Sequence, residues 1–328
     1  MHAYPRDDSV NDGAGSPNPS LIAAFNATQI VALVLLVLIL LPTILSPYVH
    51  RSVAWINIII SWIYSCVGFL LIIGHQYGKE PPFKLCLAQS LMIYSAPAMN
   101  ASACLAFALE LFLNVRSSLE GRPWRGKLLL AIFPYIVPLM ICIEVFVLGI
   151  TNRNGVSKNL PSMYCHLESS LPSQITGAVV ILFELAIFPV VGMTTVFFYR
   201  NWHAFRSMQI RQSVVPLRMI IRFAIFCLLP IPVLALSFCI LKFPDSSTAE
   251  ETGILTVAIG TLPIAASLIF GTSADLFRAW MFWKKDEPPF RRNASVRSAP
   301  RPPMSVTKPP LTKERPLRRP LPDVIDIA

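Results

Sequence analysis

The chain has 328 residues, of which 54% are hydrophobic and only 14% charged, and its formal net charge is +10 at pH 7. A soluble globular domain carries about 25% charged residues, so this composition excludes an ordinary soluble protein and indicates a membrane protein. We expect the positive charge to lie against the anionic lipids of the inner leaflet, and we predict no nucleic-acid partner.

Seven apolar stretches follow a polar N-terminal segment, residues 1–23. Crossing a hydrocarbon core of ~30 Å takes roughly 20 apolar residues. Because backbone groups in lipid must be hydrogen-bonded within their own segment, we expect helices rather than open strands. The sequence therefore predicts an all-α membrane protein in which residues 24–274 form a seven-transmembrane helix bundle. The stretches are 24–48, 52–74, 85–112, 128–150, 174–199, 216–241 and 253–274.

Lysine and arginine residues indicate which side of the membrane each loop occupies, because cytoplasmic loops carry an excess of them. An extracellular N-terminus leaves only six of the 28 basic residues outside: Arg6, Lys79, Lys84, Arg153, Lys158 and Lys242. We therefore predict a multi-pass protein of the plasma membrane with its N-terminus extracellular and its C-terminus cytoplasmic.

Two of the seven cysteines lie outside the apolar cores. Cys86 opens the third stretch, in FKLCLAQ, and Cys165 lies in the external loop between the fourth and fifth stretches. Both face an oxidising compartment, where disulfides form and persist. We predict a Cys86–Cys165 bond that fixes this loop onto the third helix. The alternative is two free thiols.

Several polar side chains within the stretches are candidates for binding or for bridging helices. Glu144 and Glu184 are acids in the fourth and fifth stretches, where an ionised carboxylate must face protein, water or a cation. We predict that Tyr94, Glu184 and Glu144 bind a ligand, with Tyr94 and Glu184 lining a cavity open to the outside. The alternative is that the acids are protonated or hydrogen-bonded and only pack helices. We expect Asn57 and Asn100 to bridge helices.

The positions of histidine and lysine bear on two further classes of protein. A metal-dependent seven-helix hydrolase needs His and Asp clustered at one depth, but all five histidines fall outside the apolar cores. A retinal protein needs a lysine in its last helix, and 253–274 contains none. We predict no metal site, no cofactor and no catalytic residues, so the protein is not expected to be an enzyme.

The region after the last stretch divides into two parts. Residues 275–285 combine Leu, Phe, Met and Trp with Arg and Lys, which is typical of a short amphipathic helix in the inner interface. Residues 286–328 are rich in Pro, Arg, Lys and Ser, which predicts a disordered, basic, Pro-rich cytoplasmic tail. Arg292 lies three residues before Ser295, which predicts phosphorylation of Ser295 by a basophilic kinase and weaker attachment to lipid.

This layout resembles the G-protein-coupled receptors and is similar to uncharacterised seven-helix receptor-like proteins of fungi. The shared features are an external N-terminus, seven helices, a cysteine at the start of helix three and a partner cysteine in the second external loop. The acid–Arg–aromatic triplet of the rhodopsin-like receptors corresponds to Glu110-Leu111-Phe112, so the acid is present and the arginine is not. Helix seven has Pro263, in GTLPIAASLIF, without the Asn and Tyr expected beside it.

Glu110 suggests a contact between two helices at the inner interface. It lies 24 residues beyond Cys86, which is about 36 Å along a helix. Arg218 and Arg222 begin the sixth stretch, four residues apart on one helical face. We predict that Glu110 pairs with one of them in the resting state, which resembles the receptor lock between helices three and six. The alternative is an acid that is solvated by water or paired with Arg116.

These features together predict a cell-surface receptor that senses an extracellular ligand. The resemblance implies that it signals to cytosolic partners, with a heterotrimeric G protein as the expected one. Two other classes stay open. A secondary transporter or channel-like protein would use the intramembrane Glu144 and Glu184, and a scaffold would bind no ligand.

Overall fold

In the computed structural model, the predicted interfacial helix over 275–285, the predicted tail over 286–328 and its Ser295 lie outside the described residues. The side chains of 118–120, 217–220 and 249–250 also lie outside this set. The structure describes residues 18–45, 51–78, 80–120, 126–159, 161–202, 217–228 and 249–272.

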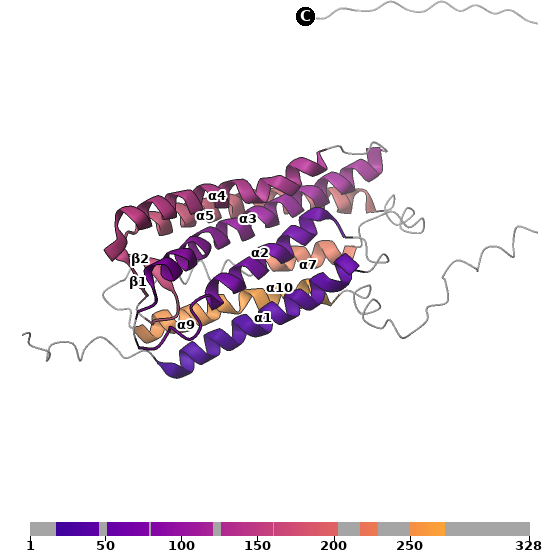
Figure 1. Ribbon diagram of the computed structural model, residues 1–328. Coiled ribbons are helices and arrows are strands. Elements are labelled where there is room, and N and C mark those ends of the chain that lie inside the picture. The colour runs from indigo at the N-terminus through magenta and orange to yellow at the C-terminus, as the bar shows by residue number, and fades with distance from the viewer. Residues whose placement is uncertain are drawn as a thin grey trace, which may run out of the picture. The chain divides into compact units, whose positions relative to one another are not determined.

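Helices make up most of the described chain (Figure 1). They are α1 (Pro19–Leu45), α2 (Val53–Leu70), α3 (Phe83–Glu120), α4 (Lys127–Thr151), α5 (Leu171–Arg200), α7 (Leu217–Leu228), α9 (Ala249–Gly260) and α10 (Leu262–Gly271). One 3-10 turn and two short strands lie between α4 and α5: η1 (Arg153–Gly155), β1 (Val156–Lys158) and β2 (Cys165–Leu167). The end of the bundle that carries β1 and β2 is named the hairpin end below.

Within the described residues, six helices are long and apolar enough to cross a membrane. Five are α1 to α5, and the sixth spans Glu251–Gly271, which covers α9 and α10. The expectation of a mostly helical membrane protein is therefore confirmed. Of the predicted sixth stretch, 216–241, the structure describes the 12 residues of α7, so the count of seven stays a prediction.

α3 occupies the centre of the bundle, between α4 and α2 (Figure 1). In its most apolar window 72% of the residues are buried, against 28% in α4 and 22% in α5. Large apolar side chains on α4 and α5 are exposed, among them Met140 at 63% and Leu182 at 64%. Exposed apolar side chains of this kind suit contact with lipid tails. An internal site is therefore expected among the buried residues that face α3.

Close approach between α2 and α3 depends on a glycine. A Cβ added at Gly68 would lie 2.9 Å from the Cβ of Met92, closer than real Cβ atoms come. Small residues let the backbones of membrane helices approach and gain dispersion contacts. Gly68 thereby allows α2 to pack against α3 at the level of the candidate site.

Aromatic rings join α7 to its neighbours. Phe223 meets Phe107 of α3 with ring centroids 4.8 Å apart, and Phe226 meets Phe270 of α10 at 5.1 Å. Phe226 also packs edge-on against Trp62 of α2 at 6.1 Å. Edge-to-face pairs of this kind contribute about 0.5–1.5 kcal/mol each beyond the area they bury.

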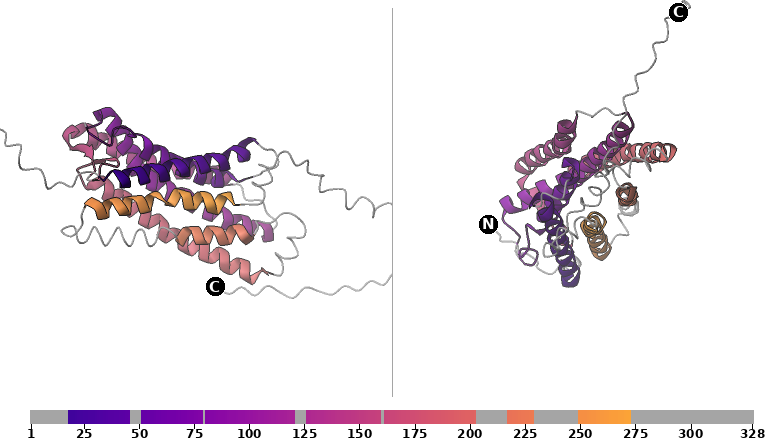
Figure 2. Two further views of the ribbon diagram at one scale, coloured as in Figure 1. Left: turned by 90° about the horizontal axis from the view of Figure 1, so that it is seen from below. Right: turned by 90° about the vertical axis from the view of Figure 1, so that its right-hand side faces the viewer.

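The last described span is interrupted between α9 and α10. Pro263 stands at the start of α10 and has no N–H to donate, so a continuous helix would lose a hydrogen bond there. Ile264 N and Ala265 N instead both donate to Thr261 O, at 3.0 and 3.1 Å. The views in Figure 2 place these two helices, in orange, beside α1.

Candidate functional site

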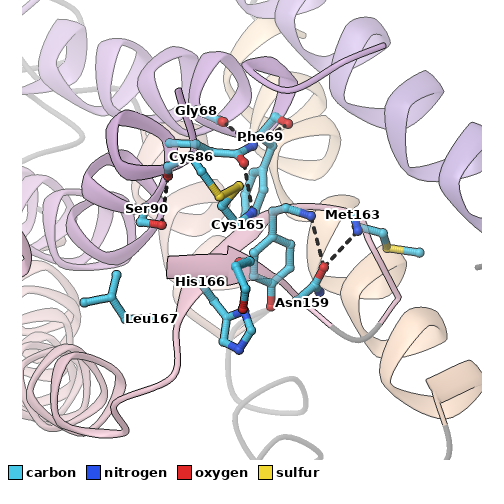
Figure 3. Close-up of a disulfide and its surroundings, with 12 residues drawn as sticks. Gly68, Phe69, Cys86, Ser90, Asn159, Met163, Cys165, His166 and Leu167 are labelled. Atoms are coloured by element: carbon cyan, nitrogen blue, oxygen red, sulfur yellow. Dashed lines mark hydrogen bonds between the residues drawn. A yellow bond between two sulfur atoms is a disulfide. The ribbon is translucent and has the colours of Figure 1, made fainter. Parts of the chain in front are cut away.

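A disulfide fixes the hairpin onto the start of α3 (Figure 3). The Cα atoms of Cys86 and Cys165 lie 5.3 Å apart, within the usual range for a bonded pair. The predicted Cys86–Cys165 bond is confirmed. It holds the loop between α4 and α5 on the central helix of the bundle.

Gln89, one helical turn after Cys86, reinforces this attachment. Its side chain is fully buried, and its Oε1 accepts a hydrogen bond from Cys165 N at 2.9 Å. Its Nε2 donates to the carbonyl oxygens of Gly68 and Phe69 at 3.0 and 3.2 Å. One amide therefore joins the hairpin to both α3 and the end of α2. A Gln three residues after a disulfide cysteine, on the same helical face, is a signal in the sequence that points to this role.

The turn of the hairpin is closed by an asparagine. β1 and β2 pair antiparallel, with Lys158 opposite Cys165. Asn159 Oδ1 accepts hydrogen bonds from Met163 N at 2.8 Å and Tyr164 N at 3.1 Å (Figure 3). An Asn side chain that accepts hydrogen bonds from backbone N–H groups a few residues later takes the place of a backbone carbonyl and stabilises a turn in the chain. The sequence does not predict these strands.

The hairpin also contacts α1 and the chain between α2 and α3. Met163 is fully buried against Ile22 and Phe25 of α1. Its carbonyl oxygen accepts from Gln76 Nε2 at 3.1 Å, and Gln76 exchanges two hydrogen bonds with Asn26 of α1. These contacts attach the hairpin to α1 and to the chain between α2 and α3, in addition to its attachment through the disulfide.

Tyr164 extends the same packing to α2. Its ring lies edge-on to Phe69 at 6.0 Å, and burial raises the pKa of its hydroxyl. Burial disfavours the charged phenolate because a charged group loses its solvation inside the protein.

A cavity of about 360 Å³ lies between α2, α3, α5, α7, α9 and α10. Tyr94 connects it with the hairpin, because its hydroxyl accepts from Leu167 N at 3.2 Å while the residue lines the cavity. Most of the wall is apolar. Its described aromatic residues are Trp62, Phe69, Tyr94 and Phe226.

Glu184 of α5 is the one charged residue among those described that line the cavity. Its side chain is partly buried. The structure thus brings Tyr94 and Glu184 to one cavity, as predicted, whereas Glu144 does not belong to the described wall. One carboxylate oxygen of Glu144 is buried on α4 without a hydrogen-bond partner among the described residues. That any of the three binds a ligand stays a prediction.

The two asparagines bridge helices in the expected way. Asn57 Nδ2 on α2 donates to Ala131 O of α4 at 2.9 Å, and its Oδ1 accepts from Tyr135 OH at 2.9 Å. Asn100 Nδ2 on α3 donates to Ser65 Oγ of α2 at 3.0 Å. These bonds hold α2, α3 and α4 together beside the cavity.

Glu110 lies far along α3 from the hairpin end. It is 8% exposed, and its Oε2 has no hydrogen-bond partner in the described part of the chain. Phe107, three residues earlier, makes the ring contact with Phe223 that brings α7 to α3. Arg222 immediately precedes Phe223 on α7, while the side chain of Arg218 lies outside the described residues. The predicted ion pair stays a prediction.

The arrangement suits non-covalent binding of a small molecule. A mostly apolar cavity with a few polar groups is the usual form of such a site. Among the described residues, no group of three or more His, Cys, Asp or Glu is placed to hold a metal ion. No protein-family model matches the chain, and no curated protein matches it.

Proposed function

We propose that the protein is a seven-transmembrane receptor of the plasma membrane that binds an extracellular ligand and signals to a heterotrimeric G protein. The observation that carries the proposal is the cavity lined by Tyr94 and Glu184, which adjoins a disulfide-fixed hairpin. A protein with a purely structural role has no need of a cavity of about 360 Å³ in its core, since interiors are close-packed. In this proposal the hairpin end faces outside, and anionic inner-leaflet lipids lie at the opposite end.

One aromatic residue of the cavity wall offers a route for the signal. Phe226 of α7 lines the cavity, and Phe223, nearly one turn earlier, contacts Phe107 of α3 at 4.8 Å. Glu110 lies three residues beyond Phe107. A ligand that displaces Phe226 therefore shifts α7 against α3 beside the predicted lock, because packed elements move by discrete rearrangement rather than by continuous deformation.

Complex formation with a nucleotide-free heterotrimeric G protein tests the proposal. The detergent-solubilised receptor should co-elute with the G protein, and a non-hydrolysable GTP analogue should dissociate the complex. Glu110→Gln should raise basal nucleotide exchange if the predicted pairing holds the resting state. The absence of a complex and of stimulated exchange, for both wild type and Glu110→Gln, would overturn the coupling.

The Glu184 carboxylate on the cavity wall favours one alternative, a secondary transporter or channel-like protein. Intramembrane acids often serve as proton or ion sites. Liposomes that contain the purified protein and a pH-sensitive dye separate the two functions. A receptor should add no proton flux over protein-free liposomes under an applied potential, whereas a transporter should add a flux that Glu184→Gln removes.

A further inference from the structure

The charge of the cavity is concentrated at one point. Glu184 is the sole charged side chain among the described lining residues, and none of those residues is a lysine, an arginine or a histidine. The rest of the described wall is apolar or neutral. A carboxylate in such surroundings lacks the basic partner that buried acids normally have.

The carboxylate of Glu184 is also free of competing hydrogen bonds within the described part of the chain. Two hydroxyl groups of the described wall donate to backbone oxygens: Thr176 Oγ1 donates to Tyr94 O at 3.0 Å, and Ser173 Oγ donates to Ser170 O at 2.7 Å. No described residue of the wall is hydrogen-bonded to this acid, which leaves the carboxylate available to a ligand.

Aromatic rings form another part of the wall of this cavity. Trp62, Phe69, Tyr94 and Phe226 come from three helices and line the same cavity. The face of an aromatic ring attracts a cation, and the attraction reaches about 2 kcal/mol when the cation is desolvated. A carboxylate combined with several aromatic rings is a suitable environment for an organic ammonium ion and an unfavourable one for an anion.

We propose that the cavity binds a small lipophilic organic cation, an amine or a quaternary ammonium compound. Its charged nitrogen lies at Glu184 and its apolar body lies among the aromatic rings. The cavity volume of about 360 Å³ equals that of roughly twelve water molecules in the liquid, which limits the ligand to a small compound. This inference rests on the proposed function, since it names the class of ligand that the same cavity takes.

Two probes of the same shape isolate the charge. Benzyltrimethylammonium carries a permanent positive charge, and neopentylbenzene is its neutral isostere. With the protein in nanodiscs, benzyltrimethylammonium should bind and raise the unfolding temperature. Glu184→Gln should weaken its binding by roughly tenfold or more, which corresponds to about 1.4 kcal/mol. Binding of neopentylbenzene should be the same for wild type and Glu184→Gln.

Three further variants keep the test decisive. Gly177→Phe fills the cavity from α5, where a Cβ at Gly177 would meet no atom within 4 Å, so it should abolish binding of both probes without touching Glu184. Glu168→Gln, which removes an exposed acid beside the hairpin, should bind like wild type and serves as the matched control. Glu184→Asp keeps the charge and should retain binding if Glu184→Gln fails to fold.

Several results would overturn this ligand class. They are equal affinity for the charged and neutral probes, unchanged affinity in Glu184→Gln, and loss of binding in Glu168→Gln. The proposed receptor function fails separately. Charge-dependent binding without a G-protein complex would overturn the coupling and leave the ligand class standing, and the reverse pattern would overturn the ligand class alone.

Discussion

At the hairpin end a disulfide and a network of hydrogen bonds hold the bundle, whereas farther along α3 the helices α3, α7 and α10 meet through aromatic rings. Cys86, Gln89 and Asn159 make directional bonds to the hairpin. Phe107, Phe223 and their neighbours make edge-to-face ring contacts, which are less strictly directional than hydrogen bonds. The first kind of contact fixes one arrangement, and the second leaves the helices more freedom to repack.

This difference suits the proposed receptor. A fixed hairpin end keeps the cavity in shape while no ligand is bound, so less ordering is needed on binding. A region joined by ring packing allows α7 to change position against α3. Changes at the hairpin end should therefore alter stability, and changes around α7 should alter signalling more than stability.

Removal of the disulfide should have the largest effect. The bond joins residues 79 positions apart, and for a loop of that length the chain-entropy relation gives about 4.5 kcal/mol. The double variant Cys86→Ser with Cys165→Ser should therefore unfold at a much lower denaturant concentration. Hydrogen exchange should accelerate at the amides of β1 and β2.

The matched control is Cys142→Ser, which changes a partly buried free cysteine of α4. It should unfold close to wild type. Wild-type stability in the double serine variant, with slow exchange in the hairpin, would show that hydrogen bonds rather than the disulfide fix this end.

Gln89→Leu should have the next largest effect. It leaves Cys165 N and two carbonyl oxygens without the partner they now have, and a buried polar group left unsatisfied costs about 1–3 kcal/mol. Chemical unfolding in detergent measures the loss. Gln174→Leu, at an exposed position of α5, is the control and should be nearly neutral. A neutral Gln89→Leu would mean that the disulfide alone holds the hairpin.

The sequence predicts those parts of the fold that depend on local signals. Length and apolar composition locate the spans, and the placement of Cys86 and Cys165 predicts the disulfide. Glu184 and Tyr94 are predicted to share a cavity because both lie in the outer half of helices that the resemblance implies are neighbours. The first two signals need no knowledge of distant neighbours, whereas the third depends on the expected arrangement of the helices.

Other features depend on how the helices are rotated and on which residues meet. A helix that is apolar over most of its surface carries little periodicity that fixes its rotation, so the place of Trp62 of α2 in the cavity wall cannot be read from the sequence. Glu144 shows the same limit. It is an intramembrane acid like Glu184, yet it lies on α4, outside the described wall of the cavity. The three-residue strands β1 and β2 are too short to give an alternating pattern.

Phe223→Leu tests the other side of the comparison. It removes the edge-on contact with Phe107, and we expect a loss of about 1–2 kcal/mol of stability. Because the contact joins α7 to α3 near Glu110, basal nucleotide exchange on the G protein should change. Phe133→Leu removes a ring pair of similar geometry between α4 and α5, with centroids 5.9 Å apart. It should cost similar stability and leave basal exchange unchanged. Equal exchange in both variants would mean that the α7 contact has no special role.

Tyr94→Phe should have the smallest effect on stability. It tests the hydrogen bond that joins the cavity wall to the hairpin. Tyr94 lines the cavity and also accepts the hydrogen bond from Leu167 N at 3.2 Å. The variant keeps the ring and removes that acceptor, so we expect a loss of about 0.5–1.5 kcal/mol. The loss should appear as faster hydrogen exchange at the Leu167 amide, with the β1–β2 pairing retained. Tyr77→Phe is the control, since its hydroxyl bonds to Pro19 O at an exposed site and should contribute little. If Tyr94→Phe leaves exchange at Leu167 unchanged, the hairpin is held independently of the cavity wall. A ligand that moves Tyr94 would then leave the structure of the hairpin end unchanged.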